Sequence, residues 1–416
     1  MDKLRIRGGK KLLGTVQVGG AKNAALPILF SSLLTDETCT YEQMPELQDI
    51  ESTVALLEHL GAQVKREDHV AHVKSGVKLG THAPYDLVRK MRASVLTLGP
   101  LLARYGQAEV SLPGGCAIGA RPINLHLAGM EKLGAKIELE QGYVRAQAKA
   151  LVGNRVTFEM PSVGATENVL MAAVLAKGES VLENCAREPE IVDLAQALRA
   201  MGAKIEGEGS EQIRVQGVSA LKGCRYRVMG DRIEAGTYLA AGFITRGKVR
   251  VNGLDYQNYE AVLERFEAAG AKIQRHADGV ELDGSGRAQG VDVTTLPYPG
   301  FPTDMQAQFM AVMCTADGAS MITETIFENR FMHVPELQRL GADITIRGKS
   351  ALVRGKEKLI GAPLMATDLR ASASLVLGGL CAEGETVVNR VYHLDRGYER
   401  MEEKLRSLGA DVVRIQ

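Results

Sequence analysis

The chain has 416 residues, of which 45% are hydrophobic and 24% are charged, a composition that is ordinary for a globular protein. Fifty basic and fifty acidic residues cancel, so no net charge attracts nucleic acid or an anionic membrane, and we expect neither as a partner. The first residues lack the apolar run of a signal peptide, and no stretch reaches the ~18 apolar residues of a membrane span. We therefore expect a cytoplasmic protein with more than one domain, because single cores stop growing near ~250–300 residues.

The six cysteines and eight histidines form no pattern that is typical of a metal site. The cysteines lack close CxxC spacing and the histidines are scattered, so we expect no bound metal. Most cysteines lie in helix-like or strand-like runs, where a thiol acts as a small buried apolar group. Cys116 differs, because it lies in a glycine-rich segment.

A Gly-Ala pair occurs six times along the chain, each time between a helix-like and a strand-like stretch. The glycines are Gly61, Gly134, Gly202, Gly270, Gly341 and Gly409, at intervals of 68 to 73 residues. So regular a period indicates one folding unit that is repeated six times. We expect each glycine to provide the left-handed turn that commonly ends a helix.

Two kinds of helix are predicted in each unit. Amphipathic helices, with apolar residues at steps of three and four, precede the Gly-Ala pairs at 49–59, 122–132, 189–200, 258–268, 331–339 and 397–407. Helices that are apolar nearly all round, and therefore buried, lie further upstream at 24–34, 93–103, 169–176, 235–244, 307–314 and 371–381. With strands between them, the pattern predicts an α/β fold of six units, three per domain, with the domain boundary near 228–230.

Polar or charged residues open the buried helices at matching positions. These residues are Asn23, Arg92, Thr166, Glu234, Asp304 and Arg370. Acidic side chains at a helix N-terminus can act as caps, which explains Glu234 and Asp304, whereas a cation opposes the helix dipole. We expect several of these helix ends to gather around one polyanionic ligand; the alternative is that they are ordinary surface charges. Since no glycine-rich phosphate loop is found, side chains must hold any phosphate.

The segment LPGGCAIGARPINL at 112–125 combines reactive groups with a flexible backbone. Its glycines and proline are typical of a mobile loop, which can close over a ligand. Cys116 stands five residues before Arg121, and a nearby cation lowers the pKa of a thiol. We interpret Cys116 as a reactive thiol; the alternative is a core cysteine.

Seven separated motifs resemble those of one enzyme family. They are GGAKNAALPI (19–28), RASVLTLGPLL (92–102), LPGGCAIGARPINL (112–125), AREPEIVDL (186–194), FPTDMQAQF (301–309), TETIFENRF (323–331) and TDLRASASLVL (367–377). The chain resembles, along its whole length, the UDP-N-acetylglucosamine 1-carboxyvinyltransferase (MurA) family, whose sister family is EPSP synthase. The resemblance implies a two-domain inside-out α/β barrel, with three repeats per domain and the active site in the interdomain cleft. The implied first domain is 22–229, with the mobile Cys loop 112–121, and the second is 1–21 plus 230–416.

The resemblance also implies a reaction. The enolpyruvyl group of phosphoenolpyruvate passes to the 3′-hydroxyl of UDP-N-acetylglucosamine and phosphate is released, the first committed step of peptidoglycan synthesis. No cofactor is needed, because phosphoenolpyruvate brings its own activated group. A thiol at Cys116 implies sensitivity to fosfomycin, and Cys116→Asp should abolish that alkylation while sparing some turnover.

Residue roles follow from the matched motifs. The implied catalytic residues are Cys116 as general acid, Asp304 as base, Lys22 and Arg396. Those implied for phosphoenolpyruvate are Lys22, Asn23, Arg92, Arg121, Arg370 and Arg396. Those implied for UDP-N-acetylglucosamine are Asn23, Arg92, Arg121, Pro122, Ile123, Asn124, Leu125, Ser162, Val163, Gly164, Asp304 and Ile326. Asn124 and Met160 depart from the family pattern, which often has an acidic residue and a lysine there.

Two alternatives stay open. One is an EPSP synthase-like transferase that uses shikimate 3-phosphate or another acceptor. The other is a non-catalytic paralogue that binds UDP-N-acetylglucosamine; the presence of every implied catalytic residue type argues against it. The sequence gives no indication of the oligomeric state.

Overall fold

The computed structural model describes residues 2–112 and 123–416, which form two compact units. The N-terminal unit comprises residues 20–112 and 123–229, and the C-terminal unit comprises residues 2–19 and 230–416. Along the described residues, no helix is long and apolar enough to cross a membrane. Each unit has its own hydrophobic core.

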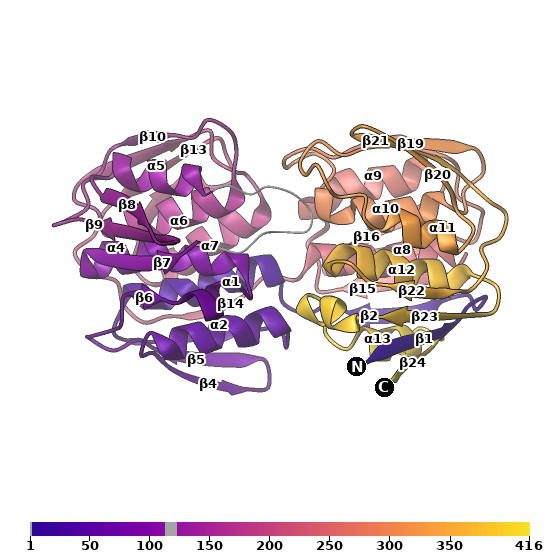
Figure 1. Cartoon of the computed structure of the whole chain (residues 1–416), viewed down its shortest axis with the longest axis horizontal. Helices are drawn as coiled ribbons and strands as arrows, with labels where there is room; N and C mark the ends of the chain where they lie inside the picture. Colours follow the sequence, from indigo (N-terminus) through magenta and orange to yellow (C-terminus); the bar gives the residue numbers. More distant parts are fainter. Residues whose placement is uncertain (1, 113–122) are drawn as a thin grey trace. The chain divides into compact units, whose positions relative to one another are not determined.

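The N-terminal unit contains three four-stranded sheets (Figure 1). The first, in the order β14-β3-β5-β4, consists of Arg225–Arg227, Thr38–Glu42, Val70–Lys74 and Gln63–Glu67. The second, β6-β7-β9-β8, consists of His82–Ala83, Gln107–Ser111, Tyr143–Gln147 and Lys136–Glu140. The third, β10-β11-β13-β12, consists of Arg155–Thr157, Glu179–Glu183, Gln212–Gln216 and Lys204–Glu206.

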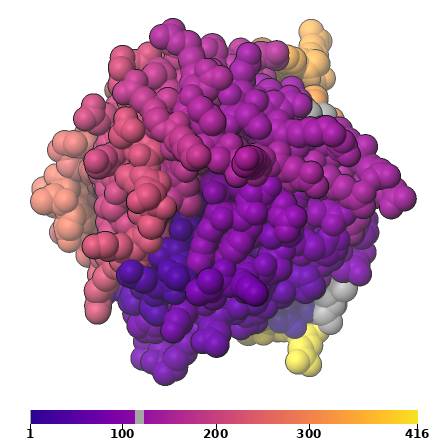
Figure 2. All heavy atoms as spheres, turned by 90° about the vertical axis from the view of Figure 1, so that its left-hand side faces the viewer, coloured from indigo at the N-terminus to yellow at the C-terminus, as the bar shows by residue number. Residues whose placement is uncertain are grey.

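Three inner helices fill the middle of this unit. They are α1 (Lys22–Ser31), α4 (Leu98–Tyr105), which follows the 3₁₀ turn η2 (Arg92–Thr97), and α6 (Val163–Ala173). The outer helices are α2 (Gln48–His59), α5 (Asn124–Lys132) and α7 (Pro189–Ala200), beside the short α3 (Tyr85–Val88) and η1 (Ser32–Leu34). Figure 2 shows the surface of this unit from one side. The apolar side chains of the inner helices are almost fully buried.

The C-terminal unit repeats this plan. Its sheets are β16-β17-β15-β2 (Lys272–His276, Gly279–Asp283, Lys248–Asn252, Leu13–Gln17), β18-β19-β21-β20 (Val293–Thr294, Ala319–Thr323, Ser350–Arg354, Asp343–Arg347) and β22-β23-β1-β24 (Pro363–Met365, Glu385–Asn389, Lys3–Arg7, Asp411–Ile415). Its inner helices, which pack against one another, are α8 (Arg232–Ile244), α10 (Gln306–Met313) and α12 (Leu369–Cys381). Its other helices are α9 (Glu260–Ala268), α11 (Val334–Arg339) and α13 (Met401–Ser407), with the 3₁₀ turns η3 (Tyr256–Tyr259), η4 (Thr303–Met305) and η5 (Val391–Arg396).

The start of the chain belongs to the C-terminal unit. Strand β1 lies between β23 and β24, and strand β2 pairs in parallel with β15. Helices inside and sheets outside make each unit an inside-out α/β barrel, so the predicted fold class is confirmed.

The six Gly-Ala turns have the expected conformation. All six glycines have φ between 92° and 103°, in the left-handed region that L side chains rarely adopt. Five of the turns lead into a β-hairpin, for example β4 followed by β5, whereas the turn at Gly409 leads into β24, which pairs with β1 at the start of the chain. These hairpin strands are at most five residues long, and their exposed faces weaken the apolar signal.

The structure corrects three predictions about helix starts. Helix α6 begins at Val163 rather than 169, because the Ser162 hydroxyl accepts a hydrogen bond from the Ala165 amide. Helix α8 is capped by Asp231, which accepts hydrogen bonds from two backbone amides, and not by Glu234. Asp304 is not a cap either, because its carboxylate binds two arginines. Glu234 instead forms an ion pair with Lys404 at 2.6 Å.

Candidate active site

In the C-terminal unit, the carboxylate of Asp304 lies between two guanidinium groups. Arg330 Nη2 donates to Oδ1 at 2.7 Å, and Arg370 Nη2 and Nε donate to Oδ2 at 2.9 and 3.2 Å. The Asp304 side chain is 25% exposed, whereas those of Arg330 and Arg370 are 6% and 4% exposed. One carboxylate and two cations are thus held together at the edge of the core.

The two arginines control the protonation of Asp304. Burial by itself raises the pKa of a carboxyl group, but the charges of Arg370 and Arg330 reverse this effect and hold the pKa of Asp304 well below its usual range. Asp304 is therefore ionised at neutral pH, and it is a weak base as long as both arginines stay bound to it.

A buried glutamate continues the network toward Ile326. Thr303 accepts a hydrogen bond from Arg330 Nη1 at 2.9 Å and donates to Glu324 at 2.9 Å. Glu324 Oε1 in turn accepts from the amide of Ile326 at 2.8 Å. The loop that carries Ile326 is therefore fixed relative to Asp304. Arg396 ends the turn η5, two residues before Tyr398, whose hydroxyl accepts a hydrogen bond from Arg370 Nη1 at 3.2 Å.

In the N-terminal unit, Lys22 is paired with an acidic residue that the sequence did not single out. Lys22 Nζ lies 2.6 Å from Asp49 Oδ2, and the side chains are 10% and 3% exposed. Lys22 opens helix α1 and Asp49 lies in the first turn of α2, where a negative charge suits the helix dipole. Asn23, beside Lys22, is exposed.

A second cluster in this unit surrounds His126 on α5. Its Nδ1 lies 3.0 Å from Asn168 Nδ2, and the oxygen of that amide accepts from the Gly99 backbone at 2.7 Å. The amide orientation is thereby set, so Nδ1 accepts and the ring is neutral with its proton on Nε2. Burial lowers the pKa of His126 to about 4, and the charge of Arg92 adds to this shift. A Cβ at Gly164 would lie 3.2 Å from the His126 ring, so the Ser162–Gly164 turn lies against it.

The remaining predicted residues are placed as follows. Ile123, Asn124 and Leu125 stand at the start of α5, and Asn124 is exposed. Thr166 accepts a hydrogen bond from the Ala186 amide, a structural role rather than one at a ligand. Cys116, Arg121 and Pro122 lie outside the described residues. Each unit thus assembles a part of the expected set, and the direct contacts join Asp304 to Arg370.

Sequence analysis missed Asp49, His126, Arg330 and Tyr398. Arg330 lies within the motif 323–331, but nothing in the spacing connects it with Asp304, from which it is separated by 26 positions. Asp49 carried a usable signal, an acidic residue in the first turn of a predicted helix. His126 and Tyr398 carried none, because single residues in amphipathic stretches are usually packing residues.

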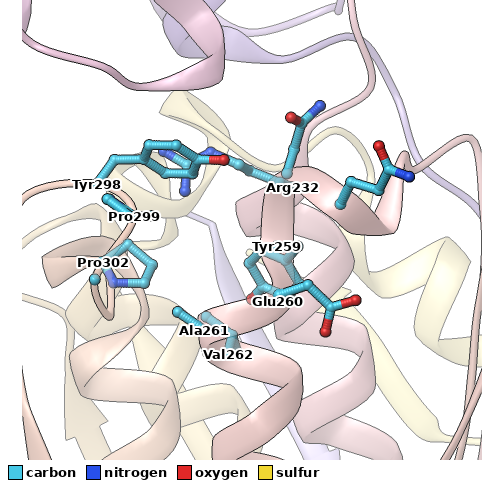
Figure 3. Close-up of a pocket in the computed structure, with 11 residues that line it drawn as sticks. Arg232, Tyr259, Glu260, Ala261, Val262, Tyr298, Pro299 and Pro302 are labelled. Atoms are coloured by element: carbon cyan, nitrogen blue, oxygen red, sulfur yellow. The ribbon is translucent and has the colours of Figure 1, made fainter. Parts of the chain in front are cut away.

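A small pocket in the C-terminal unit is distinct from these clusters (Figure 3). It lies beside the start of α8 and the turn η3, where the Arg232 guanidinium stands 5.9 Å from the centre of the Tyr298 ring. None of the predicted site residues lines it. Within residues 2–112 and 123–416, no group of three His, Cys, Asp or Glu side chains is arranged to hold a metal ion.

Comparison with known proteins defines the class of the fold and site. The model of the EPSP synthase (3-phosphoshikimate 1-carboxyvinyltransferase) family matches residues 6–405, and the chain belongs to this family. The enolpyruvyl transferase NikO from Streptomyces tendae has a TM-score of 0.88 at 25% identity, over 99% of this chain and 98% of its own. EPSP synthase from Acinetobacter baumannii is similar in fold, with a TM-score of 0.78 at 20% identity over both full chains.

Much more similar relatives narrow this assignment. The chain is 58% identical over 419 residues to the UDP-N-acetylglucosamine 1-carboxyvinyltransferase of Pseudoalteromonas atlantica, with 100% of both chains covered. It is 57% identical over 416 residues to a protein of the same name from Nitratidesulfovibrio vulgaris, again with full coverage. The resemblance drawn from seven motifs is thereby confirmed.

Proposed function

We propose that the chain transfers the enolpyruvyl group of phosphoenolpyruvate to the 3′-hydroxyl of UDP-N-acetylglucosamine, with release of phosphate. The observation that carries the reaction class is the Asp304 carboxylate held by Arg330 and Arg370, a base beside two cations that suit a phosphate and a carboxylate. The full-length similarity to transferases of that name supports the choice of acceptor.

The chemistry that we assign is an addition followed by an elimination. Asp304 accepts the proton of the sugar hydroxyl while the hydroxyl oxygen bonds to C2 of phosphoenolpyruvate. The Cys116 thiol donates a proton to C3. The tetrahedral product then returns a C3 proton to the Cys116 thiolate while the bond from C2 to the phosphate oxygen breaks. This step restores the double bond, and inorganic phosphate leaves with the proton that Asp304 holds. Cations around the reacting anions stabilise the charge that develops in both steps.

The geometry around Asp304 suggests how it becomes a stronger base. A phosphate or carboxylate of the substrate competes with Asp304 for the same guanidinium protons. When the substrate anion takes Arg330 or Arg370, Asp304 loses the charges that hold its pKa down, and its basicity rises. Substrate binding and activation of the base are then one event.

The remaining roles rest on the matched motifs. We assign phosphoenolpyruvate to Lys22, Asn23, Arg92, Arg121, Arg370 and Arg396. We assign the sugar nucleotide to Asn23, Arg92, Arg121, Asp304, Ile326 and the segments 122–125 and 162–164. Because nucleotide sugars and phosphoenolpyruvate are made in the cytoplasm, we propose that location for the protein.

One assay tests the function. Phosphate release from phosphoenolpyruvate is measured with UDP-N-acetylglucosamine and, separately, with shikimate 3-phosphate, for the wild type and Cys116→Ser. We expect release with the nucleotide sugar alone and a large loss in the variant. Release with shikimate 3-phosphate would favour the EPSP synthase-like alternative, and nucleotide binding without release in either assay would favour a non-catalytic paralogue.

A further inference from the structure

One buried hydroxyl connects all three inner helices of the C-terminal unit. Tyr398 is 1% exposed, and its oxygen lies 2.9 Å from Thr237 Oγ1 on α8, 3.2 Å from Gln308 Nε2 on α10 and 3.2 Å from Arg370 Nη1 on α12. Helix α12 carries Arg370, and α10 follows directly after the turn η4, which carries Asp304. The Tyr398 ring also lies 5.5 Å from the Arg370 guanidinium.

The protons in this network can be assigned. Thr237 donates to the Ile233 carbonyl at 2.8 Å, so its oxygen accepts the single proton of the Tyr398 hydroxyl. Arg370 and Gln308 are donors, and they occupy the two lone pairs of the Tyr398 oxygen. Gln308 Nε2 gives one of its two protons to the backbone carbonyl of Asp304 at 2.9 Å and shares the other between the Tyr398 and Thr237 oxygens, each at 3.2 Å. Every hydrogen-bonding capacity of the Tyr398 hydroxyl is therefore used.

Resting on the function proposed above, we propose that Tyr398 is a positioning residue that holds Arg370 in place for the substrate anion. Arg370 has two sides: Nε and Nη2 face Asp304, whereas Nη1 is bound by Tyr398. When an anion replaces the Asp304 carboxylate, the contact with Tyr398 remains, so the guanidinium keeps its orientation. Without the hydroxyl, the ring contact remains but Asp304 is the only hydrogen-bond acceptor left for the guanidinium among the described residues, so Arg370 must reorganise whenever substrate binds.

The charged groups around Arg370 and Asp304 determine how the pH dependence of kcat/KM is interpreted. Arg330 and Arg370 face Asp304, Asp231 acts on both Arg370 and Tyr398, and His333 lies near Arg330. Tyr398→Phe alters none of these charges. It changes only how firmly Arg370 is held, so a shift of the acidic limb of the profile reports on the contact between Arg370 and Asp304.

The test compares Tyr398→Phe with Tyr238→Phe. Tyr238 is a matched control, since it is also fully buried in this unit but its hydroxyl has no hydrogen-bond partner among the described residues. In the proposed assay we expect Tyr398→Phe to lower kcat/KM for phosphoenolpyruvate about tenfold, the scale of one lost hydrogen bond to a charged group. The acidic limb of the pH profile of kcat/KM should also move to higher pH. Tyr238→Phe should match the wild type in kcat/KM and in the position of this limb.

Two outcomes overturn the proposal. One is that the two variants behave alike; the other is that Tyr398→Phe lowers only the melting temperature. If Tyr398→Phe does not fold, Thr237→Val, which removes the acceptor of the Tyr398 proton, must produce the same change in a weaker form.

A wild type that releases no phosphate overturns the proposed function instead. The positioning role is then judged by calorimetric titration with phosphoenolpyruvate alone. An affinity of Tyr398→Phe equal to that of the wild type rejects the role.

Discussion

At the scale of single residues, buried charges here are paired with partners that restrict their geometry. Lys22 illustrates this: its side chain is only 10% exposed, and a charge that is largely removed from water needs a counter-charge, which Asp49 provides at 2.6 Å. The pair places the ammonium group at the start of α1, where the matched motif expects phosphoenolpyruvate. Asp49, which has no assigned role in the reaction, can thus decide whether Lys22 is correctly placed for the role proposed for it.

We predict that Asp49→Asn weakens this pair. Asparagine keeps the size and a hydrogen-bond acceptor but removes the charge, so the N-terminal unit should lose about 2 kcal/mol of unfolding free energy. The KM for phosphoenolpyruvate should rise, because Lys22 is held less firmly. Denaturant unfolding measures the change in unfolding free energy, and steady-state kinetics measure the change in KM. Asp36→Asn, at an exposed residue, is the control. An Asp49→Asn protein equal to the wild type in both measurements would contradict the assignment.

The neutral, buried His126 makes stability depend on pH. Its pKa is about 4 in the folded protein, below the unfolded value of ~6.5, so the unfolded chain binds more protons between these values. The contribution of His126 to stability is therefore complete above pH ~6.5 and is lost as the pH falls toward 4, by up to about 3 kcal/mol. Unfolding free energies between pH 7 and 5 should fall less for His126→Gln than for the wild type. His59 is exposed, so His59→Gln should show the same dependence of unfolding free energy on pH as the wild type. The prediction is refuted if His126→Gln also shows the wild-type dependence.

At the scale of elements, the repeated turn is a conformational requirement rather than a packing one. A Cβ at Gly270, for example, would have no atom within 4 Å, yet φ there is +97°. The free-energy cost of adding a side chain at Gly270 must therefore come from the backbone conformation and not from a steric clash. The same situation holds at Gly134, Gly202 and Gly341, which explains why glycine occurs at these turns.

We predict that Gly270→Ala destabilises the protein by about 1–2 kcal/mol, the cost of placing an L residue in the left-handed region. Gly286→Ala is the matched control, because a Cβ there also meets open space but the backbone is not in that region. Thermal unfolding of the two variants measures the difference. Equal melting temperatures would show that the turn tolerates a side chain.

At the scale of the whole molecule, the chain forms two units, and its first residues stabilise the second of them. Ile6 of β1 is fully buried in the core of the C-terminal unit, between strands β23 and β24. The separate cores predict that damage to one unit leaves the other folded. Folding of the C-terminal unit must then wait for the last strand of the chain to meet one of the first.

Ile6→Ala tests this arrangement. Truncation of a fully buried isoleucine should cost about 2–5 kcal/mol, and the loss should be confined to the C-terminal unit. Hydrogen exchange followed by peptide mass spectrometry locates it: exchange should accelerate in β23 and β24 but not in α1 or α6. Leu13→Ala, at a side chain that is 60% exposed, should leave the pattern unchanged. Faster exchange in both units would mean that they unfold together.

The repeat, the six left-handed glycines, the two kinds of helix and the α/β class were predictable from the sequence, because they depend on residues close together along the chain. The inside-out arrangement followed from the resemblance. The sequence motifs also singled out Lys22, Asp304 and Arg370. The partners of these residues were not predictable, since Arg370 reaches Asp304 across 66 positions and Tyr398 contacts Thr237 across 161. Such contacts arise when helices from different repeats pack together, and no local periodicity encodes them. For the same reason the cap of α8, the second strand of each hairpin and the pairing of β1 with β23 and β24 became evident only in the folded chain.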